Sequence, residues 1–323
     1  MIHDTSRARV AAIGVGYLGR HHARILSQLD GVELVAVVDI NHKRAEEVAA
    51  AAGTVALSDV GELLGMSLDA VTVAVPTEAH HAVARPFLEK GVSVLVEKPM
   101  ARTLEEADEL IVASETSGAT LAVGHTERFN PAVTAALSLV SNPGFVEVHR
   151  LGTFPERSLD IDVVFDLMIH DLDVLLAAVP GDVVGLEAVG VPVLTGRVDI
   201  ANARVRFSSG CIANVTASRI SRDRVRKVRF FQQDAYISID YASQEVEHWR
   251  LARGSAERPD IVGGRVEVMR DEPLRIEIAD FVNAVRTGQR PRVTGGDGRK
   301  ALALARQVSD AIAQGQQTPR GGR

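Results

Sequence analysis

The sequence predicts an α/β domain with a parallel sheet, followed by an α+β domain with a large antiparallel sheet. Up to about Gly124, short and almost continuously apolar strands alternate with helical segments, which is typical of a parallel sheet covered on both faces. Beyond that point, strands follow one another through short turns such as Ser209-Gly210, as in an antiparallel sheet. The length of 323 residues fits two domains. We expect them to span residues 1–124 and 125–323.

In the first domain, the apolar runs predict buried strands and the intervening periodic segments predict helices. The expected strands are Val10–Ile13, Leu34–Val38, Val71–Val75, Ser93–Val96 and Thr120–Val123. The expected helices are Tyr17–Leu29, Asn41–Ala52, Glu78–Lys90 and Leu104–Thr116. Gly53 is the expected stop of the second helix.

In the second domain, one helix is expected at Val164–Val179 and two more close the chain at Arg275–Arg286 and Asp297–Ala313. Packing of the two closing helices back on the first domain is left open as an alternative. A polar tail is expected at 314–323. The expected strands are Phe145–Gly152, Val184–Val191, Ile200–Phe207, Ile212–Ser218, Lys227–Phe231, Ala235–Asp240 and Glu245–Arg250.

Composition excludes several classes of protein. The net charge of −6 is unfavourable for general nucleic-acid binding, which needs a basic surface. A single cysteine, Cys211, excludes an internal disulfide and a multi-cysteine zinc site. No apolar run approaches the roughly 20 residues of a membrane span, and the first residues carry no secretory apolar region. We therefore expect a cytoplasmic protein that binds neither membrane nor nucleic acid.

A glycine-rich turn is the clearest motif. Gly14-Val15-Gly16-Tyr17-Leu18-Gly19 matches G-x-G-x-x-G, follows an expected strand and opens an expected helix. Asp39 ends the next strand, 20 residues after Gly19. This is the full context of a dinucleotide site, in which the glycines admit the diphosphate to the helix N-terminus. The alternative is an ordinary strand-to-helix turn.

Asp39 also predicts which dinucleotide is bound. A carboxylate at this position accepts hydrogen bonds from the ribose hydroxyls and repels a 2′-phosphate, so NAD is expected rather than NADP. Lys43 and Arg44 leave NADP as the less favoured cofactor.

Two further segments carry side chains suited to proton transfer. Lys98 follows a buried strand at the edge where ligands bind in parallel sheets, and Pro99 favours an extended backbone before it. Asp166 and His170 are four residues apart and would share one face of a helix. Imidazole titrates near neutral pH and suits a general base. The alternatives are an exposed lysine and a surface ion pair; a metal site with Asp171 is disfavoured because no second histidine has a matching spacing.

Together these motifs resemble the glucose–fructose oxidoreductase/inositol dehydrogenase/MocA family. The resemblance rests on the glycine turn with Asp39, Ala74-Val75-Pro76-Thr77, Glu97-Lys98-Pro99, Asp166-x-x-x-His170, Asp280-Phe281 and 296–302, in that order. It implies a Rossmann domain and a domain with a large open antiparallel sheet that often mediates homodimers or homotetramers. One departure is Val163-Val164-Phe165, where many members carry a glycine pair before the aspartate.

The family's site residues carry over by position. The resemblance implies that Lys98, Asp166 and His170 are the catalytic trio of an enzyme oxidising a sugar hydroxyl. In that reading His170 takes the proton, Lys98 stabilises the oxygen, and Asp166 orients the substrate or the imidazole. The cofactor contacts would be Gly14, Gly16, Tyr17, Leu18, Gly19, Asp39, Pro76, Thr77, His80, Glu97 and Lys98. His21, His22 and His81 are expected on the surface.

The substrate is the least defined part. The segment 124–131 and the run around His170 resemble the subgroup acting on nucleotide-activated amino sugars, such as the 3-dehydrogenases of UDP-N-acetylglucosamine and of its uronic acid. This implies oxidation of the 3-hydroxyl to a 3-keto sugar. Substrate contacts are then expected from Lys98, His125, Arg128, Asn130 and His170. The alternative for Arg128 is an ion pair at the domain junction.

A basic cluster bears on the choice of substrate. Its members are Arg219, Arg222, Arg224, Arg226, Lys227 and Arg229. Arginine forks suit a diphosphate, whereas the alternative is a solvated sheet edge or an oligomer contact. Two other functions stay open: a dehydrogenase of a free polyol or aldose, and a non-catalytic NAD-binding regulator, against which the intact trio argues.

Overall fold

The computed structural model describes residues 7–154, 161–252 and 260–317, and its contacts divide the chain into two compact units. The first unit contains the residues up to Thr126 together with Glu272–Arg299. The second contains Glu127–Asp271 and the residues from Lys300 onward. None of the described helices is long and apolar enough to cross a membrane.

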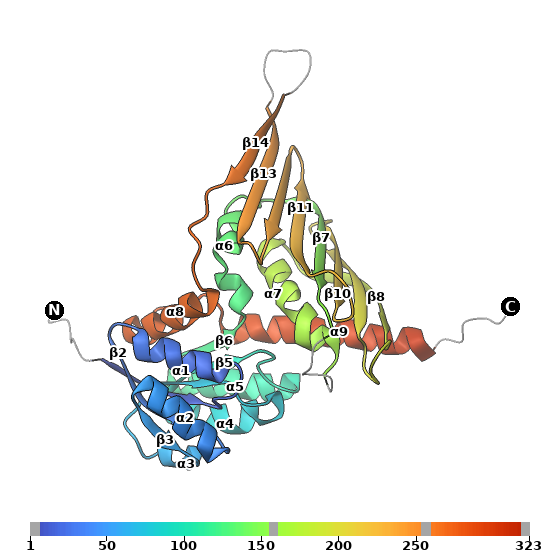
Figure 1. The fold of residues 1–323 in the computed structure, drawn as a ribbon. Coiled ribbons are helices and arrows are strands. Elements are labelled where there is room, and N and C mark those ends of the chain that lie inside the picture. The colour runs from blue at the N-terminus through green and yellow to red at the C-terminus, as the bar shows by residue number, and fades with distance from the viewer. Residues whose placement is uncertain (1–6, 155–160, 253–259, 318–323) are drawn as a thin grey trace. The chain divides into compact units, whose positions relative to one another are not determined.

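The first unit is built on a six-stranded parallel sheet with the strand order β3-β2-β1-β4-β5-β6 (Figure 1). This is the order of a dinucleotide-binding Rossmann fold, and the order reverses between β1 and β4. The strands are β1 (Ala8–Ile13), β2 (Val32–Val38), β3 (Val55–Leu57), β4 (Ala70–Val73), β5 (Ser93–Glu97) and β6 (Leu121–Gly124). The helices are α1 (Gly19–Gln28), α2 (His42–Ala52), α3 (Val60–Leu63), α4 (Thr77–Glu89), α5 (Leu104–Ser117) and α8 (Pro273–Thr287).

Helix α8 belongs to this unit although it lies far along the chain. Its Leu274, Ile278, Phe281 and Val282 join the same buried apolar cluster as Ile25 and Leu26 of α1. The 3.6-residue spacing of these side chains places them on one face of the helix. The first unit therefore includes a helix that the sequence supplies only after the second sheet.

The second unit is built on an eight-stranded sheet with the order β14-β13-β12-β11-β7-β10-β9-β8 (Figure 1). Neighbouring strands are antiparallel except β7 and β10, which pair in parallel. The strands are β7 (Pro143–Leu151), β8 (Val183–Val191), β9 (Ile200–Phe207), β10 (Ile212–Ser218), β11 (Val225–Gln232), β12 (Ala235–Asp240), β13 (Glu245–Ala252) and β14 (Asp260–Val266). The helical segments are η1 (Thr126–Phe129, beginning in the first unit), α6 (Pro131–Leu137), η2 (Val164–Met168), α7 (Ile169–Ala178) and α9 (Gly295–Gln317), which enters this unit at Lys300.

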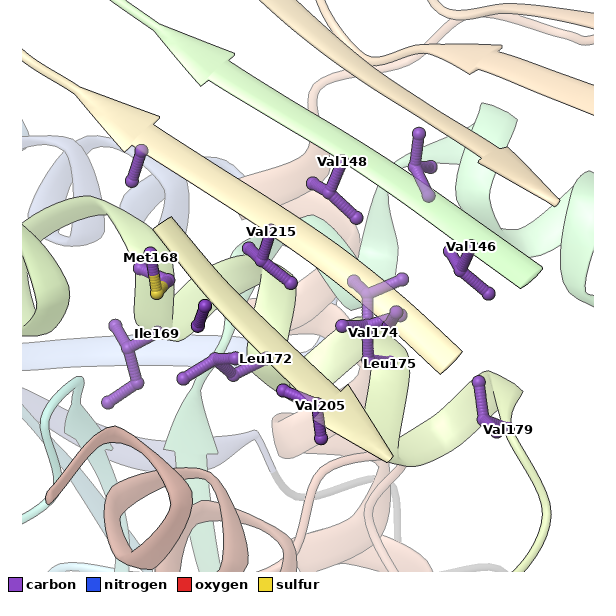
Figure 2. Close-up of a cluster of buried hydrophobic side chains, with 14 of the residues drawn as sticks. Val146, Val148, Met168, Ile169, Leu172, Val174, Leu175, Val179, Val205 and Val215 are labelled. Carbon is purple, nitrogen blue, oxygen red and sulfur yellow. The ribbon is translucent and has the colours of Figure 1, made fainter. Parts of the chain in front are cut away.

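One face of this sheet packs against α7 and forms the core of the unit. Figure 2 shows side chains of α7, among them Leu172 and Leu175, in one buried cluster with the valines of the neighbouring strands. Those valines are Val146 and Val148 of β7, Val205 of β9 and Val215 of β10. Their period-2 spacing puts every second strand residue on the helix-covered face. On the other face, here called the open face, the side chains of these strands are mostly half-buried or exposed.

The fold class predicted from the sequence is confirmed, with local corrections. Strand β14, with Gly263 and Gly264 in its middle, was not expected, and neither were β3, α3 and α6. The sheet is antiparallel apart from the β7–β10 pair. Helix α9 continues to Gln317, past the predicted end at Ala313, and residues 318–323 of the expected tail lie outside the described part of the chain.

Candidate active site

The glycine turn after β1 is tightly packed at two of its three glycines. Gly14 has a φ of +79°, and a Cβ there would lie 2.7 Å from the side chain of Val75. A Cβ on Gly19 would lie 1.8 Å from the carbonyl oxygen of Gly14. Around Gly16 the space is open, because the nearest atom to a Cβ would be an Arg44 nitrogen at 3.9 Å. The turn therefore keeps one open backbone position next to the helix N-terminus.

The start of α1 is suited to hold an anion. The residue before the helix, Leu18, makes no side-chain cap, so no side chain occupies the first N–H groups of α1 through an N-cap bond. These groups, together with the helix dipole, attract negative charge. Tyr17 and Leu18 are exposed at this end, and the guanidinium of Arg20 lies 5.2 Å from the centre of the Tyr17 ring.

Asp39, at the end of β2, is fixed against this turn. One carboxylate oxygen accepts a hydrogen bond from the backbone nitrogen of Val15 at 3.0 Å, and the other accepts from that of Asn41 at 2.9 Å. The side chain is only 7% exposed, with an Arg44 nitrogen 3.7 Å from its carboxylate. The structure therefore brings Asp39 and the glycine turn together, with a guanidinium beside them.

The Glu97-Lys98-Pro99 segment leaves β5 between buried side chains. Glu97 is buried, and its carboxylate lies 3.0 Å from Nε2 of His22 on α1. The same carboxylate accepts a hydrogen bond of 3.3 Å from the backbone nitrogen of Lys98. A Cβ on Gly124 of β6 would lie 2.8 Å from the Glu97 carboxyl carbon, so only glycine leaves room for this group.

The expectation that His22 lies on the surface is wrong, because its side chain is fully buried. The residue next to His22 does not reveal this burial, because His21 is also polar and does not indicate which face of α1 is covered. The signal lay in the spacing of His22 to Ile25 and Leu26, which are both buried. His22 thus belongs to the surroundings of the segment that carries Lys98.

His80 is the second histidine next to this segment. Its ring is 1% exposed, with Nδ1 2.8 Å from the carbonyl oxygen of Pro99 and Nε2 2.9 Å from that of Val75. Burial lowers the pKa of His80, and the two carbonyl bonds only partly offset this. Pro76 and Thr77, which open α4, lie between Val75 and His80 in the chain. The loops after β4 and β5 are therefore joined by one imidazole.

In the second unit, Asp166 and His170 lie on a helix that begins with a π-helical turn. Residues Val164–Met168 form this turn, η2, and Ile169 continues it as α7. The predicted single α-helix from Val164 to Val179 is therefore wrong in its first turn and ends one residue early. Both side chains are half-buried. Because a π turn has more than four residues, two residues four apart still share one side of the helix.

The predicted substrate residues around the unit boundary have different surroundings. His125, which belongs to the first unit, is buried just after β6. Asn130 is 3% exposed and caps α6, because its side-chain oxygen accepts from Ala132 at 3.0 Å while its nitrogen donates to the Tyr241 carbonyl at 3.0 Å. Arg128 forms an ion pair of 3.2 Å with the buried Asp173. These contacts show a structural use for Asn130 and Arg128 inside the second unit.

A buried ionic network near these residues was not predicted. Arg150 of β7 donates two hydrogen bonds to Asp171, at 2.6 and 2.9 Å, and a third to Glu127 at 2.9 Å. Its guanidinium lies 5.1 Å from the centre of the Tyr241 ring. Burial opposes the charge on Arg150, but the two carboxylates hold its pKa above its usual range. The sequence around Asp171 does not indicate that its ionic partner lies on another element, the strand β7.

The basic cluster is largely used within the second unit. Arg219 is buried and bound to Asp199 at 2.9 Å, Arg229 is bound to Glu147 at 2.7 Å, and Lys227 lies 3.5 Å from Asp240. Arg224 donates to Thr153 at 3.3 Å. Because these cations have acidic or polar partners, the cluster gives little support for a diphosphate site.

Comparisons with known proteins give a matching family and several relatives. The family model described as "Oxidoreductase family, NAD-binding Rossmann fold" matches residues 8–125. The chain is 39% identical to UDP-N-acetylglucosamine 3-dehydrogenase of Acidithiobacillus ferrooxidans, over 97% of this chain and 98% of that one. It is 26% identical to scyllo-inositol 2-dehydrogenase (NAD(+)) of Bacillus subtilis, over 96% and 95% of the two chains.

Solved structures show the same fold. A structure of UDP-N-acetylglucosamine 3-dehydrogenase from Acidithiobacillus ferrooxidans matches with a TM-score of 0.91 at 37% identity, covering 96% of this chain and 99% of that chain. A levoglucosan dehydrogenase in complex with NADH and levoglucosan matches with a TM-score of 0.85 at 18% identity, covering 96% and 98%. At that identity the second likeness shows the fold alone.

Proposed function

We propose that this chain, which belongs to the oxidoreductase family with an NAD-binding Rossmann fold, oxidises the 3-hydroxyl of UDP-N-acetylglucosamine or a related nucleotide sugar to the 3-keto sugar. The observation that carries the proposal is the 39% identity, over nearly the whole of both chains, to an enzyme named for that reaction. Oxidation of a CH–OH group follows from the family. The choice of sugar and of the carbon oxidised follows from the relative.

The residues around the glycine turn fit NAD as the hydride acceptor. Gly14 and Gly19 have no room for a Cβ, whereas Gly16 faces open space beside the N-terminus of α1. Such a turn suits a diphosphate, and the anchored carboxylate of Asp39 suits the ribose hydroxyls. We assign the cofactor to Gly14, Gly16, Tyr17, Leu18, Gly19 and Asp39, with Pro76, Thr77, Glu97 and Lys98 toward the nicotinamide. NADP is disfavoured because Asp39 repels a 2′-phosphate.

The proposed chemistry assigns one task to each member of the trio. NAD, when bound, accepts the hydride from the sugar carbon. His170 takes the hydroxyl proton on a ring nitrogen, Lys98 donates a hydrogen bond from Nζ to the same oxygen, and Asp166 orients the imidazole or the sugar. Lys98 belongs to the first unit, and Asp166 and His170 belong to the second.

The test is NADH formation at 340 nm with UDP-N-acetylglucosamine, its uronic acid, inositol and glucose, in the presence of a ketone trap. Turnover of a UDP-sugar at a kcat/KM well above that of inositol and glucose is expected. Preference for a free polyol or aldose would transfer the proposal to that substrate class. Absence of oxidation of every sugar would overturn it.

We also propose that the open face of the eight-stranded sheet joins two or four copies of the chain in the cytoplasm. This face carries a packed aromatic group, in which the rings of Phe145 and Phe231 lie 5.6 Å apart and those of Phe231 and Tyr236 lie 5.3 Å apart. Phe231 and Trp249 are each 38% exposed. Exposed aromatic side chains of this size are typical of interfaces. Light scattering of Phe231→Glu, compared with the unmodified protein, tests this assignment.

A further inference from the structure

We propose that His80 is a positioning residue for Lys98, because its imidazole ties the backbone of the Lys98 segment to the loop that borders the glycine turn. The inference rests on the proposed function, in which Lys98 acts on the sugar oxygen. It gives His80 a role different from the cofactor contact expected from the sequence.

Two backbone carbonyls hold the His80 ring in place. Nδ1 lies 2.8 Å from the oxygen of Pro99, the residue that follows Lys98, and Nε2 lies 2.9 Å from that of Val75. Both distances are within hydrogen-bond range, and both ring nitrogens face groups that only accept, so a neutral ring donates to one of the two carbonyls at a time. At 1% exposure, water does not compete for these bonds.

The two carbonyls belong to the two loops that border the turn. Val75 packs directly against Gly14, because a Cβ on Gly14 would lie 2.8 Å from the Val75 nitrogen. Pro99 O is one residue beyond Lys98. The ring of His80 therefore connects the position of Lys98 to the position of the glycine turn.

Lys98 is held from the other side by a different pair. The Glu97 carboxylate accepts from the Lys98 nitrogen, and His22 fixes that carboxylate at 3.0 Å. With Glu97 fixed, the carbonyl of Pro99 is the point at which a side chain from α4 fixes the far side of the segment. Loss of the bond to Pro99 would free that side while leaving the Glu97 side in place.

The charge around the ring determines how many bonds it makes. A neutral imidazole has one N–H and can donate to either Pro99 or Val75, whereas the imidazolium donates to both. The carboxylates of Glu97 and Glu78 favour the charged ring, while burial lowers its pKa. At neutral pH the tautomer protonated on Nδ1 is the one that holds Pro99.

Two amide substitutions separate the two bonds. The side-chain nitrogen of His80→Asn replaces Nδ1, and that of His80→Gln replaces Nε2, so Asn retains the donor to Pro99 and Gln the donor to Val75. His80→Phe fills the space and retains neither. His81→Gln is the matched control, because His81 is the next residue on α4 and its Nε2 lies 2.9 Å from the exposed carboxylate of Glu109.

The measurements are kcat and KM for UDP-N-acetylglucosamine, the Kd for NAD by calorimetry, and amide hydrogen exchange of the peptide covering residues 97–103. We expect His80→Gln and His80→Phe to lose on the order of 10²-fold in kcat, the size of effect that a misplaced catalytic group produces, with faster exchange in this peptide and a nearly unchanged NAD Kd. His80→Asn is expected to recover most of the loss. His81→Gln is expected to match the unmodified enzyme.

Equal losses in the Asn and Gln variants would overturn the inference, as would unchanged exchange or unchanged kcat in His80→Phe. Failure of the proposed function has a different signature. In that case the unmodified enzyme oxidises none of the sugars, while the exchange measurement still shows whether His80 holds the segment.

Discussion

The carboxylate of Asp39 accepts a hydrogen bond from the backbone nitrogen of Val15 at 3.0 Å, which ties the end of the second strand to the glycine turn. The carboxylate is thereby held in one orientation before any ligand arrives. A preorganised acceptor loses less entropy on binding than a mobile one. Through this bond Asp39 is a structural part of the glycine turn and also the source of its negative charge.

For this reason Asp39→Ser is expected to weaken NAD binding by about 1.5–3 kcal/mol, the range for a hydrogen bond to a charged group. The gap between NAD and NADP should also narrow, because the repelling charge is removed and the Arg44 guanidinium, 3.7 Å away, gains access to a 2′-phosphate. Calorimetric titration with both cofactors measures this. Asp39→Ser combined with Arg44→Ala is the control, and an unchanged NAD affinity in the single variant would remove Asp39 from the site.

Loss of a member of the trio should affect turnover more than cofactor binding. Lys98→Ala and His170→Ala are each expected to lower kcat by about 10²–10⁴-fold, the usual contribution of a positioned acid or base, while the NAD Kd stays close to normal. Lys90→Ala is a matched control, since that lysine donates to the Leu64 carbonyl at the surface. Near-normal kcat in either variant would contradict its assignment.

The contact between Gly124 and Glu97 predicts a specific loss of stability. An added methyl in Gly124→Ala would lie 2.8 Å from the buried carboxyl group, and overpacking of this kind costs about 1–3 kcal/mol. Gly144→Ala is the control, because the nearest atom to its Cβ is 3.9 Å away. Urea unfolding compares the two variants, and equal midpoints would show that Glu97 adjusts without cost.

Asp199 is expected to stabilise the second unit in a pH-dependent way. Burial raises its pKa, but hydrogen bonds from the backbone of Val193, Leu194 and Thr195 and from the Thr195 hydroxyl outweigh burial and hold the pKa well below its usual range. A carboxylate with a depressed folded-state pKa stabilises fully above its unfolded-state pKa of about 3.9, and this stability is lost as the pH falls through the lower folded-state value.

Asp199→Asn also leaves the buried Arg219 without its anionic partner, so it is expected to cost about 3–5 kcal/mol at pH 7. The difference in unfolding free energy between Asp199→Asn and the unmodified protein should shrink as the pH falls from about 5 toward the depressed folded-state pKa. Asp182→Asn, at an exposed aspartate, is the control. A difference that stays constant over this range would show that the charge of Asp199 does not stabilise the fold.

Much of the fold follows from local pattern. The apolar runs Ile200–Phe207 and Ile212–Ser218 became strands with their predicted bounds, because alternation marks the buried face of a strand directly. The position of Asp39 beside the glycine turn could be predicted because its spacing from that turn is regular in this fold. The strands follow from neighbouring residues, and the position of Asp39 follows from a known motif.

The misses share a different cause. His22, Asn130 and Arg150 are polar residues whose partners, Glu97, Tyr241 and Asp171, lie 75, 111 and 21 residues away in the chain. Polar residues are normally exposed, so only a distant partner explains their burial. Strand β14 was missed because Gly263 and Gly264 interrupt its pattern and its side chains are largely exposed. Such contacts are visible only after the chain has folded.

The π-helical turn at Val164–Met168 contains Asp166 and resembles a one-residue insertion into an α-helix. A turn of this kind accommodates one residue more than an α-helical turn. Deletion of Leu167 would let the segment relax to an ordinary α-helix and place Asp166 three residues before His170 instead of four. Residues three apart still share one face of an α-helix, so the deletion would keep both groups on one side of the helix and change their spacing along it.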